Sequence, residues 1–134
     1  MASLSFNNRH FCGASLIGPK YVLTAAHCFN AIGNSHKENI TLVFGVSNIT
    51  NLNDPNRIEK KIKKIYKHPK YVKGQIYYDV AVLEMVEEIT NFTPYVNPIC
   101  LSEEPDENVN SQVGKAVYLS GWGKKALMGK LYTV

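Results

Sequence analysis

A histidine and an aspartate supply the residue types from which a proton-transfer site can be built. His27 is the last residue of the segment Leu-Thr-Ala-Ala-His at 23–27 and is followed by a cysteine. Histidine titrates close to neutral pH, so its ring can take a proton from a nucleophile and later return it to a leaving group. Asp79 opens the apolar run 80–83, where a carboxylate without a partner would be costly. We therefore expect His27 to be a general base and Asp79 to be the carboxylate that holds its ring in one tautomer.

The cysteines around this histidine allow two interpretations. Cys12 and Cys28 are separated by 16 positions, and His27 is the neighbour of Cys28. A short disulfide loop that frames the histidine is the first interpretation. The second is a zinc site made of His10, Cys12, His27 and Cys28, although this spacing does not match the usual paired-ligand patterns.

Six segments occur along the chain in an order that is typical of one family. They are His10-Phe11-Cys12-Gly13-Ala14-Ser15-Leu16-Ile17, Leu23-Thr24-Ala25-Ala26-His27-Cys28, His68-Pro69-Lys70-Tyr71, Asp79-Val80-Ala81-Val82-Leu83, Asn97-Pro98-Ile99-Cys100-Leu101 and Gly121-Trp122-Gly123. These segments resemble the trypsin-like serine proteases of the chymotrypsin family. The resemblance implies that His27 is the general base, that Asp79 is its orienting partner, and that Cys12 bonds to Cys28. It also implies protein or peptide substrates, and no cofactor or metal is expected.

The nucleophile that this resemblance implies is not found in the sequence. In the family it lies in a Gly-Asp-Ser-Gly-Gly segment whose backbone amides also form the oxyanion hole, and the 134 residues contain no such segment. We therefore expect a fragment of a secreted serine endopeptidase that is inactive alone. The alternative is a non-catalytic protease homologue that acts as a binding or cofactor protein, since a homologue can lose only its serine.

The distribution of apolar residues predicts an all-β fold. Short apolar runs are separated by Gly, Pro and Asn clusters, which is typical of strands and turns. Strands are expected near residues 2–6, 11–17, 21–25, 40–46, 62–66, 79–85 and 113–120, with a helical turn at 25–28. Ile58, Ile62 and Ile65 taken alone favour an amphipathic helix, but the resemblance favours a strand there.

The resemblance also predicts the domain organisation. Residues 1–96 are expected to form a trypsin-like β-barrel that carries His27 and Asp79. Residues 97–112 are acidic and rich in turn formers, which indicates a linker between two barrels. Residues 113–134 are expected to begin an incomplete second barrel, with its first strand at 113–120.

Other features favour an extracellular protein. Asn39, Asn48 and Asn91 each begin an Asn-X-Thr sequon and are candidates for N-glycosylation. One pair among three cysteines leaves Cys100 unpaired, and the resemblance implies a partner in an activation peptide or in the second barrel. The sequence shows neither a secretory signal nor an apolar run long enough to span a membrane.

Most of the basic residues fall in one segment. Residues 57–73 contain eight Lys or Arg residues against Glu59 alone. The favoured interpretation of this Lys-rich stretch is a solvated face, and the alternative is a surface that binds acidic protein segments or sulfated glycans. No nucleic-acid partner is expected.

Overall fold

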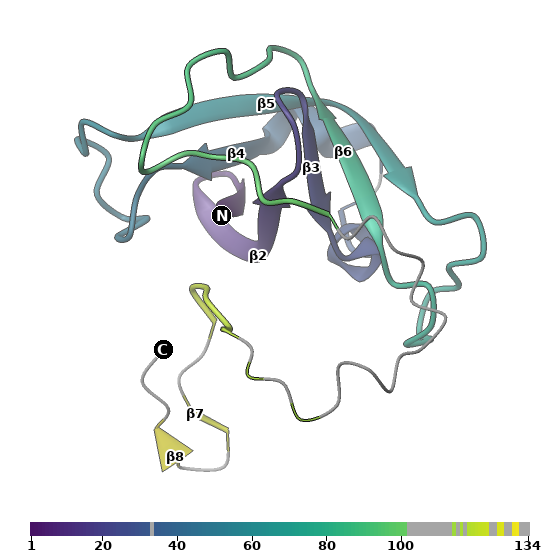
Figure 1. Ribbon diagram of the computed structural model, residues 1–134. Helices are drawn as coiled ribbons and strands as arrows, with labels where there is room; N and C mark the ends of the chain where they lie inside the picture. Colours follow the sequence, from purple (N-terminus) through teal and green to yellow (C-terminus); the bar gives the residue numbers. More distant parts are fainter. Residues whose placement is uncertain are drawn as a thin grey trace. The chain divides into compact units, whose positions relative to one another are not determined.

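Figure 1 shows the computed structural model of the chain. The structure describes residues 1–32, 34–101, 114, 116, 118–123, 126–127 and 130–131; the side chains of residues 34–36 and of those after residue 123 are not described. The chain divides into two compact units, Met1–Ile99 and Cys100–Val134. Most of the predicted linker at 97–112 lies outside the described residues, so the three-part organisation stays a prediction.

The first unit is a closed antiparallel barrel of six strands, in the order β1-β2-β3-β6-β5-β4. The strands are β1 (Ala2–Phe6), β2 (Arg9–Leu16), β3 (Tyr21–Thr24), β4 (Ile40–Phe44), β5 (Ile58–Lys67) and β6 (Ala81–Met85). Closure pairs β4 with β1, so that neither strand is left as an edge. The prediction of an all-β fold with a trypsin-like amino-terminal barrel is confirmed.

Aliphatic side chains from all six strands fill the interior of the barrel. The largest buried ones include Leu4, Leu16, Val22, Leu42, Ile62 and Leu83, each at most 4% exposed. On β6 the core residues are Ala81, Leu83 and Met85, which follow the period of two that places alternate side chains on one face. Shifting β6 by one residue would turn this apolar set out of the core, so burial fixes the register of β6 with its neighbours.

Strand β5 decides between the two interpretations of its isoleucines. It pairs with β4 on one side and with β6 on the other. Ile62 is buried, and the other residues alternate between exposed and half-buried positions except at Lys63 and Lys64, which are both exposed where the register with β6 shifts. The helical spacing of Ile58, Ile62 and Ile65 is therefore overridden by pairing with two neighbours, and the strand runs over 58–67 rather than the predicted 62–66.

Two short 3-10 helices complete the first unit. The first, η1 (Ala26–Phe29), takes the place of the predicted turn at 25–28, and the second, η2 (Asn34–Asn39), was not predicted. Neither is long and apolar enough to cross a membrane, and the same holds for the rest of the described chain. The predicted strand at 79–85 is shorter than expected, because β6 begins only at Ala81.

In the second unit, the predicted strand at 113–120 lies partly outside the described residues, so the start of a second barrel stays a prediction. Among its described residues, 114, 116 and 118–120 lie outside any strand. Tyr118 and Leu119 are exposed, so neither of these two side chains is buried in the way that a barrel strand requires. Two-residue strands β7 (Ala126–Leu127) and β8 (Lys130–Leu131) pair with each other instead.

Gly45 provides a test of the barrel's packing. It follows β4 with a φ of +79°, and a Cβ atom here would overlap the backbone oxygen of Asn56. The substitution Gly45→Ala is expected to lower the free energy of unfolding by more than about 1 kcal/mol, measured by urea unfolding. Gly18→Ala is the control, because a Cβ at Gly18 meets nothing within 4 Å. Equal effects of the two substitutions on the free energy of unfolding would contradict the conclusion that the barrel requires glycine at position 45.

Candidate active site

The register of the barrel brings the two sequence-predicted residues to the same end of neighbouring strands. Strands β3 and β6 are antiparallel, and Thr24 at the end of β3 lies opposite Ala81 at the start of β6. His27 comes three residues after Thr24, and Asp79 comes two residues before Ala81. Antiparallel pairing therefore places residues 52 apart in sequence beside each other.

His27 lies in η1 and projects outward from it. Its neighbours Ala26, Cys28 and Phe29 are buried, whereas the His27 side chain is 59% exposed. The N–H of Asn30 donates to the His27 carbonyl at 2.9 Å and closes the turn. Three buried neighbours thus anchor the turn and leave the imidazole accessible.

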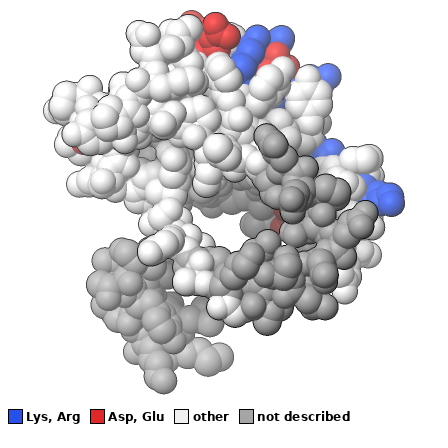
Figure 2. Space-filling view, viewed as in Figure 1, with Lys and Arg blue, Asp and Glu red and all other residues white. Residues whose placement is uncertain are grey.

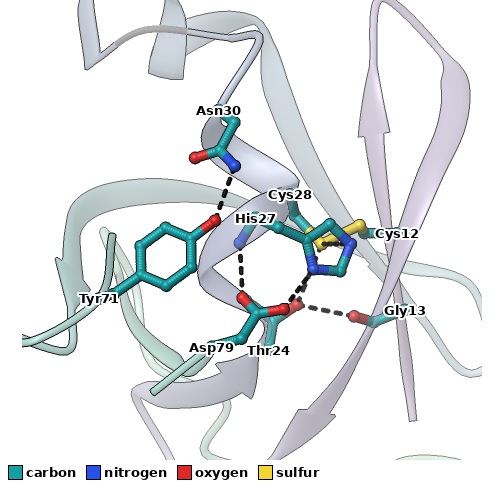
Figure 3. Close-up of polar contacts among 8 residues, drawn as sticks. All are labelled: Cys12, Gly13, Thr24, His27, Cys28, Asn30, Tyr71 and Asp79. Carbon is teal, nitrogen blue, oxygen red and sulfur yellow. Dashed lines mark hydrogen bonds and ion pairs between the residues drawn. A yellow bond between two sulfur atoms is a disulfide. The ribbon is translucent and has the colours of Figure 1, made fainter. Parts of the chain in front are cut away.

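A disulfide fixes η1 to the barrel. It joins Cys12 of β2 to Cys28 of η1, which is the pairing that the resemblance implied. Beside it, the Thr24 hydroxyl donates to the carbonyl of Gly13 at 2.8 Å (Figure 3). The ligand atoms of Cys12, His27 and Cys28 lie within 4.8 Å of one another. Zinc binds cysteine as thiolate, so sulfur atoms held in a disulfide do not fit the alternative zinc site.

Asp79 accepts two hydrogen bonds from His27. Its Oδ1 accepts the backbone N–H at 2.8 Å, and its Oδ2 lies 2.6 Å from ring Nδ1 (Figure 3). An ionised carboxylate is only an acceptor, so Nδ1 must carry the hydrogen of this bond. In the neutral ring Nε2 is then the unprotonated nitrogen. The arrangement can therefore accept a proton at Nε2 while Asp79 stabilises the positive charge that results.

The same contacts keep Asp79 ionised. The hydrogen bond from the His27 ring is the largest cause that holds the pKa of Asp79 below its usual value of 3.8, and the backbone N–H of His27 acts in the same direction. Partial burial opposes them by raising the pKa. The Asp79 side chain is 25% exposed, less than half the exposure of the His27 ring that it supports.

A hydrogen bond that the sequence did not predict supports the other end of η1. Asn30 Nδ2 donates to the Tyr71 hydroxyl at 2.7 Å (Figure 3). Tyr71 is partly buried against the core, and Lys67 Nζ donates to the carbonyl of Phe29 at 3.5 Å. Tyr71 belongs to the segment 68–71 that carried the resemblance, but nothing in the spacing pointed to Asn30.

The remaining histidine of the alternative zinc site has a different partner. Nδ1 of His10 lies 2.7 Å from the hydroxyl of Ser3, which is fully buried. Burial lowers the pKa of His10 below 6.5, which favours its neutral form. These contacts fit a histidine that is held within the barrel wall.

The three sequons differ in their surroundings. Asn39 is exposed at the end of η2, but Thr41 of its sequon is buried in β4 and accepts a hydrogen bond from Lys61 at 2.9 Å. Asn48 is exposed, and its side-chain oxygen accepts hydrogen bonds from the N–H and hydroxyl of Thr50. Asn91 is also exposed. N-glycosylation stays a prediction at all three positions.

Cys100, the first residue of the second unit, is an exposed free cysteine among the described residues. Its predicted partner would have to come from outside them. A bond to such a partner stays a prediction.

Part of the charge of the Lys-rich stretch is neutralised within the barrel. Ion pairs join Arg57 to Glu59 at 2.7 Å, Lys60 to Glu87 at 3.0 Å and Lys63 to Glu84 at 2.7 Å. Figure 2 shows basic and acidic side chains next to one another at the top of the view, where β5 lies in Figure 1. These pairs reduce the net charge available to a ligand, and an acidic or sulfated partner stays a prediction.

A hollow of about 450 Å³ opens on another part of the first unit. Its lining includes Arg9, His10, Leu52 and Arg57, and it includes neither His27 nor Asp79. This hollow is therefore separate from the His27–Asp79 pair.

Comparison with known proteins gives a consistent result. The family model described as Trypsin matches residues 1–134. The chain is 33% identical over 122 residues to transmembrane protease serine 9 of Rattus norvegicus, covering 91% of this chain and 11% of that protein. It is 34% identical over 128 residues to transmembrane protease serine 11B of Homo sapiens, covering 96% and 28%. It is 37% identical over 116 residues to atrial natriuretic peptide-converting enzyme of Mus musculus, covering 85% and 10%. The chain thus spans 10% to 28% of the length of these relatives.

The disulfide is expected to contribute measurably to stability. Replacing both Cys12 and Cys28 by serine opens a loop whose ends are 16 residues apart, which should lower the free energy of unfolding by about 3 kcal/mol. Urea unfolding measures the change, and Cys100→Ser is the matched control because Cys100 is a free thiol. A double variant as stable as the control would show that the bond does not hold η1.

The pKa of Asp79 predicts a dependence of stability on pH. Because its folded pKa is below 3.8, its contribution is present in full above 3.8 and is lost as the pH falls through the folded pKa. His27→Ala removes the largest cause of this shift, so the variant should lose less stability than the original chain between about pH 5 and about pH 2. Thermal unfolding across this range measures the difference. A difference that stays constant with pH would contradict the interpretation.

Proposed function

Because this chain belongs to the trypsin family of serine proteases, we propose that it supplies the general base and the orienting carboxylate of a serine endopeptidase. The observation that carries the proposal is the pair of hydrogen bonds from His27 to Asp79. In this function His27 is the general base and Asp79 is the residue that holds its ring. The substrate is a protein or peptide.

The proposed chemistry is acyl transfer with proton transfer at Nε2 of His27, the ring nitrogen that does not face Asp79. Nε2 of His27 takes the proton of a serine hydroxyl as its oxygen attacks the carbonyl carbon of the peptide bond. The imidazolium then gives this proton to the leaving amine, and a second proton transfer from water allows hydrolysis of the acyl-enzyme. Asp79 keeps its negative charge throughout and stabilises the imidazolium that forms during the reaction.

The nucleophile of the proposed reaction comes from residues that the 134 do not include. No Gly-Asp-Ser-Gly-Gly segment occurs in the sequence. The backbone amides of that segment also bind the developing oxyanion, which is a large part of the catalysis in such enzymes. The chain by itself is therefore proposed to be an inactive fragment of the enzyme.

The proposed location is outside the cell. The disulfide between Cys12 and Cys28 is of the kind that persists in oxidising compartments. The exposed sequon residues Asn48 and Asn91 and the exposed thiol of Cys100 fit the same environment. A partner for Cys100 outside the described residues is part of this proposal.

The activity test uses the protein that contains this chain together with the segment that supplies the nucleophile. Asp79→Asn should lower kcat for a peptide substrate by about 10⁴-fold, because the ring loses the acceptor that selects its tautomer. His27→Ala should lower kcat by about 10⁶-fold. Glu87→Gln is the matched control, since this carboxylate is 76% exposed and pairs with Lys60.

The same experiment separates the proposal from the alternative of a non-catalytic homologue. A Gly-Asp-Ser-Gly-Gly segment encoded in the same reading frame and loss of activity in both variants support the enzyme. A substituted serine and a protein without peptidase activity support the homologue. Cleavage of peptides by the 134-residue chain alone would contradict both.

A further inference from the structure

Tyr78 has a backbone conformation that its side chain disfavours. Its φ is +56°, in the left-handed region. The other non-glycine residues with positive φ, among those described, are Asn7 and Asn8, and asparagine tolerates this region far better than tyrosine. Strained residues of this kind persist only where their surroundings hold them, and they are concentrated near functional sites.

The strained residue lies directly before Asp79 and shapes the turn that presents its carboxylate. The N–H of Val80 donates to the carbonyl of Tyr78 at 2.8 Å, so Asp79 is the central residue of a three-residue turn. The N–H of His68 donates to the carbonyl of Val80 at 3.0 Å and ties this turn to the segment after β5. The backbone at Tyr78 therefore sets the direction in which the Asp79 side chain leaves the barrel.

An aromatic stack is the contact that holds Tyr78 in place. The rings of His68 and Tyr78 are nearly parallel, at 9°, with their centroids 4.8 Å apart. Lys70 Nζ lies 5.5 Å from the centre of the Tyr78 ring. Tyr78 is 50% exposed, so it is not held by burial in the core. The stack and the cation near the ring stabilise this position of Tyr78 beyond what burial of half its surface would supply.

The ring of His68 is itself fixed. Its Nδ1 accepts the backbone N–H of Lys70 at 3.2 Å, within the turn that follows β5. The N–H of Tyr71 donates to the His68 carbonyl at 2.9 Å and closes this turn. The surface on which Tyr78 stacks is thus tied to the backbone at two points.

We propose that the stack of Tyr78 on His68 is a positioning contact that holds Asp79 in its two hydrogen bonds with His27. Tyr78 and His68 are positioning residues, because they act through Asp79. The importance of this contact for catalysis rests on the proposed function, whereas its effect on Asp79 does not. Without the stack, relaxation of the Tyr78 backbone would turn the carboxylate away from His27.

Hydrogen exchange in the 134-residue chain tests this proposal without any enzymatic activity. The backbone N–H of His27 donates to Asp79, so its exchange rate reports directly on the position of the carboxylate. Tyr78→Ala and His68→Ala each remove the stack and are expected to speed this exchange about tenfold. A tenfold change corresponds to the free energy that a non-glycine residue gains when its backbone leaves the left-handed region. The pKa of Asp79, followed by carboxyl NMR, is expected to rise toward 3.8 in both variants.

Other variants separate the stack from a general loss of structure. Tyr78→Phe and His68→Phe keep two stacked rings and should exchange as the original chain does. Tyr78→Asn should also retain slow exchange, because asparagine tolerates the left-handed region without a stack. Tyr77→Ala, at the exposed neighbouring position, is the matched control. Amides of the core strand β4 should be unaffected throughout.

The outcomes for the two proposals are distinct. Unchanged exchange at His27 and an unchanged pKa of Asp79 in both alanine variants would overturn the positioning role and leave the proposed protease function untouched. Faster exchange at β4 together with His27 would also overturn it, because the stack would then serve overall stability. Because His68→Ala leaves residue 78 in place, the test stands even if Tyr78→Ala does not fold. Full activity of the complete protein with His27→Ala would refute the proposed function but not the positioning contact.

Discussion

The rest of the site depends on one carboxylate that accepts both hydrogen bonds from a single residue. Asp79 binds the backbone N–H and the ring Nδ1 of His27, so it fixes the residue's main chain and its tautomer together. Neither bond could form without the antiparallel register of β3 and β6, which sets Thr24 opposite Ala81. That register is in turn fixed by burial of alternate side chains on β6. The packing of the barrel core is therefore linked directly to the proton-accepting nitrogen.

The two members of the pair meet different physical demands. The carboxylate must stay charged close to the barrel, and its hydrogen bonds with His27 compensate for the cost of partial burial. The imidazole must stay accessible, and it projects from a short helix that is anchored by buried neighbours, a disulfide and the bond from Asn30 to Tyr71. The support is thus concentrated around η1 and the turn before β6, and the side chain that accepts the proton is 59% exposed.

The sequence indicated the main parts of this site but not the contacts that hold them. Ordered motifs pointed to His27, Asp79 and the pairing of Cys12 with Cys28, because these residue types occur in segments with strong local signatures. Strand positions followed from apolar runs, although β5 needed the resemblance to override its helical spacing. The strand was predicted to begin at residue 79, but β6 begins at Ala81. The left-handed backbone at Tyr78, just before the predicted start, could not be predicted because tyrosine disfavours that region. The bond between Asn30 and Tyr71 and the stack of Tyr78 on His68 join distant segments, so no local pattern marks them. The strand at 113–120 stays a prediction, since its described residues lie outside any strand and a strand depends on partners that its own sequence does not supply.

The location of the proton on the imidazole of His27 tests the central claim most directly. A ¹H–¹⁵N NMR spectrum of the labelled 134-residue chain at neutral pH distinguishes Nδ1–H from Nε2–H. The account predicts a proton on Nδ1, in a strong hydrogen bond that shifts its resonance far downfield, and loss of that resonance in Asp79→Asn. A proton on Nε2 alone, or a spectrum that Asp79→Asn leaves unchanged, would contradict the claim that Asp79 holds the ring in the tautomer that catalysis requires.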